Sequence, residues 1–205
     1  MRDKELTLEI TEQCDMNCSW CSTNATPNGK HVPLQRIKSQ LRTLQSMCNV
    51  VRLSGGEPLL HPDFREIVRE AKYLDYKVVL LTNGQRTSGI SIRDEFDEVV
   101  VSVINNESFL SARWYALGES RTSLHIVSVA GEESRIVDAI TFAYEQNIPI
   151  HVLALQKQGR GKNCQPSKLF TWTGMVGCNA VNKITINVKG EQFTCSAFKN
   201  RRCDL

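Results

Sequence analysis

The sequence predicts an α/β fold in which parallel strands alternate with helices. Short apolar runs with strand-like patterns recur along the first 155 residues, and several are separated by segments whose apolar residues recur at helical spacing. Glycine or polar turns follow several of these strands directly. Strands that alternate with helices pair in parallel through right-handed crossovers, so the loops at their C-terminal ends are expected to gather the functional residues.

The predicted elements follow one another in a regular order. Apolar and polar side chains alternate over residues 5–10, which predicts the first strand. Pro33 opens a helix with apolar residues at helical spacing up to Met47, and Cys48 at its end is expected to be a buried thiol. Further strands are predicted at residues 49–53, 77–81, 98–104, 123–129 and 148–155. Further helices are predicted at residues 64–74, 109–117 and 134–146.

Beyond Leu155 the alternating pattern ends. Residues 159–162 have the composition of a flexible basic loop, and residues 184–195 predict a hairpin that turns at Gly190. The chain is therefore expected to divide into a core, residues 1–156, and a small cysteine-rich extension, residues 157–205.

Charge is distributed unevenly along the chain. Of the formal net charge of +3, the part from residue 156 onward contributes +7 and the first 155 residues contribute −4. The basic part could attract phosphate or nucleic acid, or it could be a solvated face that offsets negative thiolate clusters. The sequence has no apolar run of membrane-spanning length and no signal-like start, so we expect a cytoplasmic protein without a membrane partner. Eight cysteines in such a protein indicate bound metal.

Two motifs carry the candidate chemistry. Cys14, Cys18 and Cys21 follow the first strand with C-x3-C-x2-C spacing, and zinc or a 4Fe-4S cluster requires four ligands. One coordination position is thus left for a substrate or cosubstrate. The second motif, residues 54–58, reads Ser-Gly-Gly-Glu-Pro directly after the second strand, where glycines permit a tight turn and close approach to a ligand.

The two motifs together resemble the radical S-adenosylmethionine (radical SAM) superfamily, over Glu5 to about Leu155. The resemblance implies a partial (β/α)6 TIM-like barrel in which the three cysteines bind a 4Fe-4S cluster and SAM binds the open iron. The residues that it implies around SAM are Trp20, Ser54, Gly55, Gly56, Glu57, Thr82, Asn83 and Ser102. The alternative for the two motifs is a zinc-binding loop with a Gly-Gly-Glu-Pro sequence that occurs by chance. The alternative for Trp20 is an aromatic side chain that only packs against its neighbours.

The chemistry implied by the resemblance is reductive cleavage of SAM. An electron donor such as flavodoxin or ferredoxin would reduce the cluster, and the resulting 5′-deoxyadenosyl radical would abstract hydrogen from the substrate.

Four further cysteines lie in the last 42 residues: Cys164, Cys178, Cys195 and Cys203. With the hairpin between them, they resemble the start of a SPASM/Twitch extension, which implies an auxiliary 4Fe-4S cluster. Structural zinc and free thiols are the alternatives, and Cys164 is the ligand most remote from the hairpin.

Three functions are consistent with the sequence. The basic part favours a radical SAM enzyme that modifies or rearranges a nucleic-acid base, nucleoside or nucleotide, with DNA or RNA among the substrates considered. The SPASM/Twitch resemblance instead favours radical modification of a peptide or protein side chain. A zinc-stabilised nucleic-acid-binding module without catalysis is the third, and it leaves the Gly-Gly-Glu-Pro turn unexplained.

Overall fold

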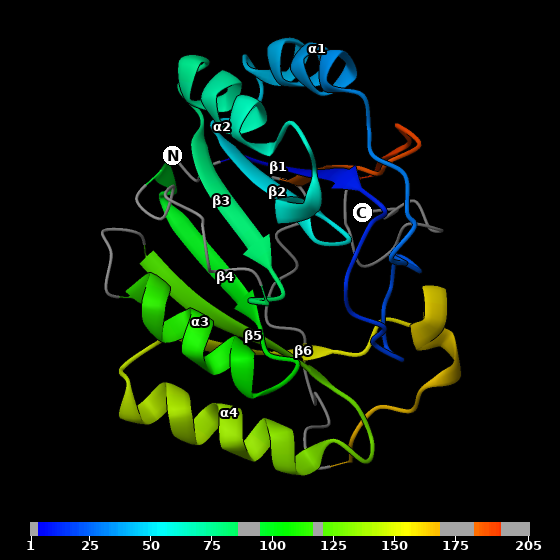
Figure 1. Cartoon of the computed structure of the whole chain (residues 1–205), viewed down its shortest axis with the longest axis vertical. Helices are drawn as coiled ribbons and strands as arrows, with labels where there is room; N and C mark the ends of the chain where they lie inside the picture. The colour runs from blue at the N-terminus through cyan, green and yellow to red at the C-terminus, as the bar shows by residue number, and fades with distance from the viewer. Residues whose placement is uncertain (1–3, 86–94, 117–120, 169–182, 194–205) are drawn as a thin grey trace. The chain divides into compact units, whose positions relative to one another are not determined.

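The computed structural model of the chain describes residues 4–85, 95–116, 121–168 and 183–193 (Figure 1). By its internal contacts the chain divides into two compact units. Unit 1 comprises residues 1–15, 25–80 and 175–205, and unit 2 comprises residues 16–24 and 81–174. Each unit is described by itself.

In unit 1 the strands run in the order β3-β2-β1-β7-β8, and all neighbours are parallel except β7 and β8. Leu6 and Leu8 of β1 lie opposite Val51 and Leu53 of β2, and all four side chains are buried. The strands are β1 (Glu5–Thr11), β2 (Val50–Gly55), β3 (Lys77–Thr82, which begins in this unit), β7 (Lys183–Ile186) and β8 (Gln192–Phe193).

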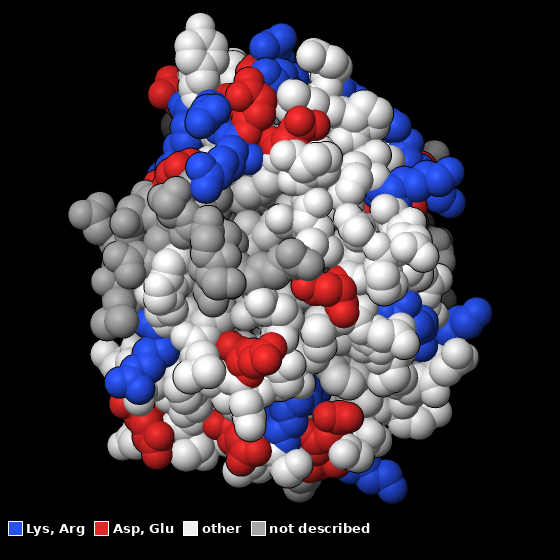
Figure 2. Space-filling view, viewed as in Figure 1, with Lys and Arg blue, Asp and Glu red and all other residues white. Residues whose placement is uncertain are grey.

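Two helices of unit 1, α1 (Leu34–Leu44) and α2 (Phe64–Tyr73), lie side by side (Figure 1). Their apolar stripes are buried, and ion pairs join the two helices: Lys38 Nζ lies 2.8 Å from Glu66 Oε1, and Arg42 Nη2 lies 2.6 Å from Glu70 Oε1. Figure 2 shows basic and acidic side chains intermingled over this part of the molecule. The charges here are balanced against each other rather than gathered into a patch of one sign.

In unit 2 the strands run in the order β6-β5-β4 and are all parallel. The strands are β4 (Glu98–Ser102), β5 (Arg121–Ser128) and β6 (Ile150–Ala154). Two helices, α3 (Asn106–Ala116) and α4 (Glu133–Glu145), pack on them (Figure 1). Val99, Val101, Leu124 and Ile126 are almost completely buried on one face of these strands, which forms the core of the unit.

The predicted alternation of parallel strands and helices is confirmed. The helix expected at residues 109–117 begins earlier, at Asn106. The first helix ends at Leu44, so the prediction that it continues to Met47 is wrong, and Met47 is 49% exposed. Cys48 is buried, as predicted.

The predicted hairpin is present in β7 and β8, with Gly190 at φ +86° in its turn. Strand β7 also pairs in parallel with β1, so this hairpin extends the sheet of unit 1. The prediction of a flexible loop at residues 159–162 is wrong, because Gly159–Asn163 form a short 3-10 helix, η3. Within the described residues, no helix combines the length and the apolar character needed to cross a bilayer.

His61 is a buried, neutral histidine in unit 1. The residue directly follows the short 3-10 helix η1 (Pro58–Leu60) and is 3% exposed. The backbone N–H of Asp63 donates to Nδ1 at 3.1 Å, so the neutral ring carries its proton on Nε2 and donates it to the Val32 carbonyl at 2.9 Å. Burial lowers the pKa of His61 below its ordinary value of 6.5, against the opposing effect of the Val32 bond.

The depressed pKa of His61 predicts a loss of stability in acid. Above about pH 6.5 the ring is neutral in both the folded and unfolded chain, whereas below this pH the unfolded chain binds the proton more readily. The free energy of unfolding should therefore fall as the pH is lowered from about 6.5 through the folded-state pKa of His61. Urea unfolding should show a smaller fall for His61→Gln, whose amide can still donate to Val32. Equal falls in both proteins would contradict the assignment.

Candidate metal and cofactor site

In unit 1, the Gly-Gly-Glu-Pro turn is hydrogen-bonded to the segment that leads from β1 to Cys14. The backbone N–H of Gly56 donates to the Thr11 carbonyl at 2.7 Å, and that of Glu57 donates to the Gln13 carbonyl at 2.7 Å. Cys14 is itself anchored, because its N–H donates to the Thr26 carbonyl at 2.9 Å. The end of β2 therefore fixes the backbone immediately before the first cysteine.

The two glycines are required by this contact. A Cβ on Gly55 would lie 2.3 Å from the Thr11 carbonyl oxygen, and a Cβ on Gly56 would lie 2.1 Å from the Gln13 carbonyl oxygen. Gly55 also has φ +133°, which disfavours other residues. The sequence indicated close approach to a ligand at these glycines, whereas the structure shows close approach to the protein's own backbone.

Glu57 and Ser54 flank these glycines. The Glu57 side chain is fully buried, and its carboxylate accepts a hydrogen bond from the Leu59 N–H at 3.2 Å at the start of η1. Ser54 is half-buried on β2, opposite Glu9 of β1. The predicted SAM contacts of Ser54, Gly55, Gly56 and Glu57 remain predictions.

In unit 2, residues 159–164 bind the backbone that carries the second and third cysteines. The Arg160 side chain donates from Nε to the Cys18 carbonyl at 2.9 Å, and the Gly161 N–H donates to the Cys21 carbonyl at 3.3 Å. The Cys21 N–H donates to the Cys18 carbonyl at 3.2 Å, and this hydrogen bond closes the turn between the two cysteines. A segment about 140 residues further along the chain thus shapes the Cys18–Cys21 turn.

The 159–164 segment packs so closely that two of its residues must lack side chains. A Cβ on Gly159 would lie 2.5 Å from the Cys21 carbonyl oxygen, and a Cβ on Gly161 would lie 3.0 Å from that of Trp20. Cys164, at the end of η3, donates from its thiol to the Ser19 carbonyl at 3.3 Å. Cys164 therefore lies beside the Cys18–Cys21 turn.

Trp20 is held by an arginine from α4. The Arg135 guanidinium carbon lies 4.5 Å from the centre of the Trp20 ring. The same guanidinium donates to the Val103 carbonyl at 2.6 Å and to the Val127 carbonyl at 3.2 Å, just beyond β4 and near the end of β5. Because Arg135 bonds both strand ends and covers the ring, it fixes Trp20 against the C-terminal ends of these strands.

The predicted cofactor residues after β3 serve the turn in which they lie. The Thr82 hydroxyl accepts from the Gly84 N–H at 3.1 Å, and Asn83 Oδ1 accepts from the Gln85 N–H at 2.9 Å. Both side chains are buried. Ser102, the last residue of β4, is half-buried. Contact of these residues with SAM stays a prediction.

The thiols of the motif have the chemistry that a cluster requires. Cys14, Cys18 and Cys21 are thiols that are not joined in disulfides, and Cys18 and Cys21 are partly exposed. Cys48 differs, because burial raises the pKa of its thiol and keeps it protonated. In the described ranges, no three Cys, His, Asp or Glu side chains are gathered in a metal-binding arrangement. Cys178, Cys195 and Cys203, three predicted auxiliary ligands, lie outside the described residues.

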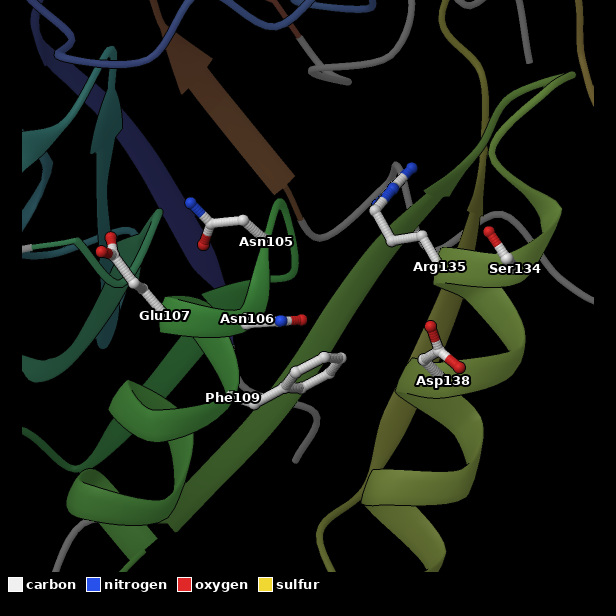
Figure 3. A pocket seen from close by; sticks show the side chains of 7 residues that line it. All are labelled: Asn105, Asn106, Glu107, Phe109, Ser134, Arg135 and Asp138. Carbon is white, nitrogen blue, oxygen red and sulfur yellow. The ribbon is translucent and has the colours of Figure 1, made fainter.

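A hollow of about 410 Å³ lies between the N-terminal ends of α3 and α4 in unit 2 (Figure 3). It is lined by Asn105, Asn106, Glu107, Phe109, Ser134, Arg135 and Asp138. In Figure 3 the Arg135 guanidinium points away from Asp138. The hollow contains none of the residues that the sequence predicted for the cofactor, and its two carboxylates make it a poor site for an anion.

Sequence reasoning missed Arg135 and the role of residues 159–164. The sequence does contain a signal for residues 159–164, because in Gly-Arg-Gly one long hydrogen-bond donor stands between two residues without side chains. That pattern suits a segment lying against another backbone as well as a basic loop. No local signal marks Arg135, because its partners come from three separate segments.

These features define a class: an α/β protein in which a three-cysteine loop follows the first parallel strand and a glycine turn follows the second. Residues 8–105, which include both motifs, match the family model described as "Radical SAM superfamily". This part of the chain is a radical SAM domain, as the resemblance predicted. Members of this family use SAM and a 4Fe-4S cluster.

Curated relatives match only parts of the chain. A probable GTP 3′,8-cyclase from Methanococcus aeolicus is 35% identical over 88 residues, which are 40% of this chain and 29% of that protein. An S-adenosylmethionine-dependent nucleotide dehydratase from Selenomonas ruminantium is 26% identical over 157 residues, covering 72% of this chain and 54% of that protein. The chain thus spans about half the length, or less, of these relatives.

The fold is also found in a solved structure. Streptococcus suis SuiB bound to precursor peptide SuiA has a TM-score of 0.73 at 16% sequence identity, covering 96% of this chain and 60% of SuiB. A likeness at this identity is one of fold. It confirms the predicted α/β class with a partial, TIM-like barrel.

Proposed function

We propose that the protein is a radical SAM enzyme that cleaves SAM reductively and modifies or rearranges a nucleotide. The observation that carries the first part is the connection between the two motifs: Gly56 and Glu57 bind the backbone of Thr11 and Gln13, directly before Cys14. The nucleotide part is supported by relatives named as a GTP cyclase and a nucleotide dehydratase.

In this proposal Cys14, Cys18 and Cys21 hold a 4Fe-4S cluster as thiolates, and the Gly55–Glu57 turn receives SAM. When bound, the cluster supplies the electron that breaks a carbon–sulfur bond of SAM. The protein's part is to hold the ligands and the cosubstrate in place. Arg160 and Gly161 fix the carbonyls of Cys18 and Cys21, and Arg135 fixes Trp20.

The first test is cleavage of SAM by the reconstituted protein. Under anaerobic conditions with dithionite, we expect methionine and 5′-deoxyadenosine to form, and one of the four ribonucleoside triphosphates to increase their rate of formation. Absence of cleavage would reject the enzyme assignment. Cleavage that is stimulated by a peptide and by no nucleotide would reject the nucleotide part. The likeness to SuiB, at 16% identity, is one of fold and does not by itself favour a peptide substrate.

Arg160 should control how firmly the cluster is held. Arg160→Ala removes the hydrogen bond to the Cys18 carbonyl, and a bond of this kind contributes about 1 kcal/mol. We expect iron to be lost to a chelator roughly fivefold faster, and the free energy of unfolding to fall by no more than about 1 kcal/mol. Lys162→Ala, an exposed basic residue in the same short helix, is the matched control. Equal iron loss in both variants would show that Arg160 acts through its charge alone.

The auxiliary cluster remains part of the proposal. Its ligands would be Cys164, Cys178, Cys195 and Cys203, in the extension that we place at residues 157–205. Cys164 lies beside Ser19 in unit 2. Iron analysis after anaerobic reconstitution tests the proposal: one cluster holds about four irons and two hold about eight. A count near four would leave no iron for the auxiliary site.

A further inference from the structure

All three nitrogens of the Arg135 guanidinium donate hydrogen bonds. Nε donates to Glu132 Oε2 at 3.1 Å, Nη1 to the Val103 carbonyl at 2.6 Å and Nη2 to the Val127 carbonyl at 3.2 Å. A guanidinium is planar, and its N–H groups lie in that plane. The three bonds therefore fix the plane and leave its two flat faces for other contacts. One face covers the Trp20 ring, with the guanidinium carbon 4.5 Å from the ring centre.

The position of Arg135 in its helix is electrostatically unfavourable. It is the third residue of α4, and a cation near the N-terminus of a helix opposes the helix dipole. In Figure 3 its side chain points away from Asp138, although an arginine and an acid three residues apart on a helix can form an ion pair. The stability of the helix alone therefore does not account for this arginine. Its bonds to two strand ends and its contact with Trp20 indicate a role at the site instead.

The contact between Arg135 and Trp20 is sheltered from water on the arginine side. The Arg135 side chain is 11% exposed, and a cation is held more strongly over an aromatic face where water is excluded. Trp20 is half-buried, so part of its surface stays accessible although Arg135 covers one face. Trp20 also directly precedes Cys21, a proposed cluster ligand. The ring thus has one face held by the protein and accessible surface next to a cluster ligand.

We propose that Arg135 is a positioning residue for SAM, because it holds Trp20 so that the adenine of SAM stacks on the ring surface that Arg135 leaves free. This rests on the proposed function and on the predicted contact between Trp20 and SAM. Stacked rings are favourable only in particular arrangements, such as an offset one. A tryptophan that could change rotamer would lose that freedom when SAM binds, which costs affinity. Arg135 holds the ring in place before SAM arrives.

The test is a double-mutant cycle on SAM affinity. Equilibrium binding of SAM is measured without reductant, so that SAM is not cleaved, on reconstituted wild type, Arg135→Gln, Trp20→Leu and the double variant. Arg135→Gln removes the cation, while its amide can still donate to a strand carbonyl. It should weaken SAM binding about fivefold in the wild type, the size expected of one cation–π contact. In the Trp20→Leu protein it should weaken binding less than about twofold, because effects that pass through one residue are not additive.

Arg113→Gln is the matched control. Arg113 is an exposed arginine of α3, the other helix of unit 2, and its substitution should leave SAM binding unchanged. Iron content and thermal unfolding are measured for each variant. A merely structural role for Arg135 would lower SAM binding equally in both backgrounds, together with the iron content or the unfolding temperature.

Two results would overturn the role of Arg135: unchanged SAM affinity in Arg135→Gln, or an equal loss of affinity with and without Trp20. If the reduced wild type still cleaves SAM in either case, the radical SAM assignment stands and only the role of Arg135 fails. A wild type that neither binds nor cleaves SAM would reject the proposed function, and this proposal with it.

Discussion

Cys18→Ala is expected to abolish reductive cleavage of SAM. The variant retains two of the three thiolates proposed for the cluster, and its methyl side chain cannot bind iron. Loss of a residue that only hydrogen-bonds to a metal ligand typically reduces metal affinity or activity about 10- to 100-fold. Loss of the ligand itself should therefore reduce the rate of SAM cleavage by more than about 100-fold. Formation of 5′-deoxyadenosine in the reduced, reconstituted variant measures the effect. The iron of this cluster should be lost, while the iron of the proposed auxiliary cluster should stay.

The matched control for Cys18 is Cys48. Like Cys18 it is a thiol outside any disulfide, but it is buried in unit 1 and its pKa is raised by burial, so it is not expected to bind iron. Cys48→Ala should retain the iron and the SAM cleavage of the wild type. If the two variants lose activity equally, the cysteines act through stability, and the ligand assignment fails. Wild-type turnover in Cys18→Ala would reject it directly.

Gly56→Ala is expected to damage both stability and SAM cleavage. The new Cβ would lie 2.1 Å from the Gln13 carbonyl oxygen, so Gln13 or the turn must move. Movement stretches the 2.7 Å hydrogen bonds from Gly56 to Thr11 and from Glu57 to Gln13. Overpacking costs roughly 1–3 kcal/mol, and urea unfolding should show a loss in this range. SAM cleavage should fall further, because the shift reaches Cys14.

Gly131→Ala separates crowding from backbone strain. Gly131 has φ +86°, but a Cβ there would meet no atom within 4 Å. The substitution should cost about 1 kcal/mol through its backbone conformation alone and leave SAM cleavage intact. A Gly56→Ala protein that matched Gly131→Ala in both stability and activity would show that the contact with Gln13 is unimportant.

Several features could be predicted because they are encoded locally. The spacing of Cys14, Cys18 and Cys21 and the Gly-Gly-Glu-Pro turn occupy contiguous residues, and each follows a strand whose pattern is visible in the sequence. Helix ends were less predictable. Met47 continues the helical spacing of α1, yet the helix ends at Leu44 because the chain must turn toward β2.

Long-range packing explains what could not be predicted. The composition of residues 159–162 predicts a flexible basic loop, because the sequence does not show which residues lie next to a glycine in space. The structure shows that Gly159 and Gly161 lie against the backbone of Trp20 to Ser22, and that Arg160 is bonded to Cys18. The basic charge of this segment therefore does not by itself indicate a phosphate site.

By itself, the sequence determined the parallel α/β fold class, the family and the thiols offered to a cluster, because strand periodicity and ligand spacing are local properties of the chain. Only the tertiary structure decided what supports these groups. The contact of Gly56 with Gln13 and the arginine over Trp20 depend on the register and packing of distant segments. Such contacts arise when the chain folds, and no short stretch of residues records them.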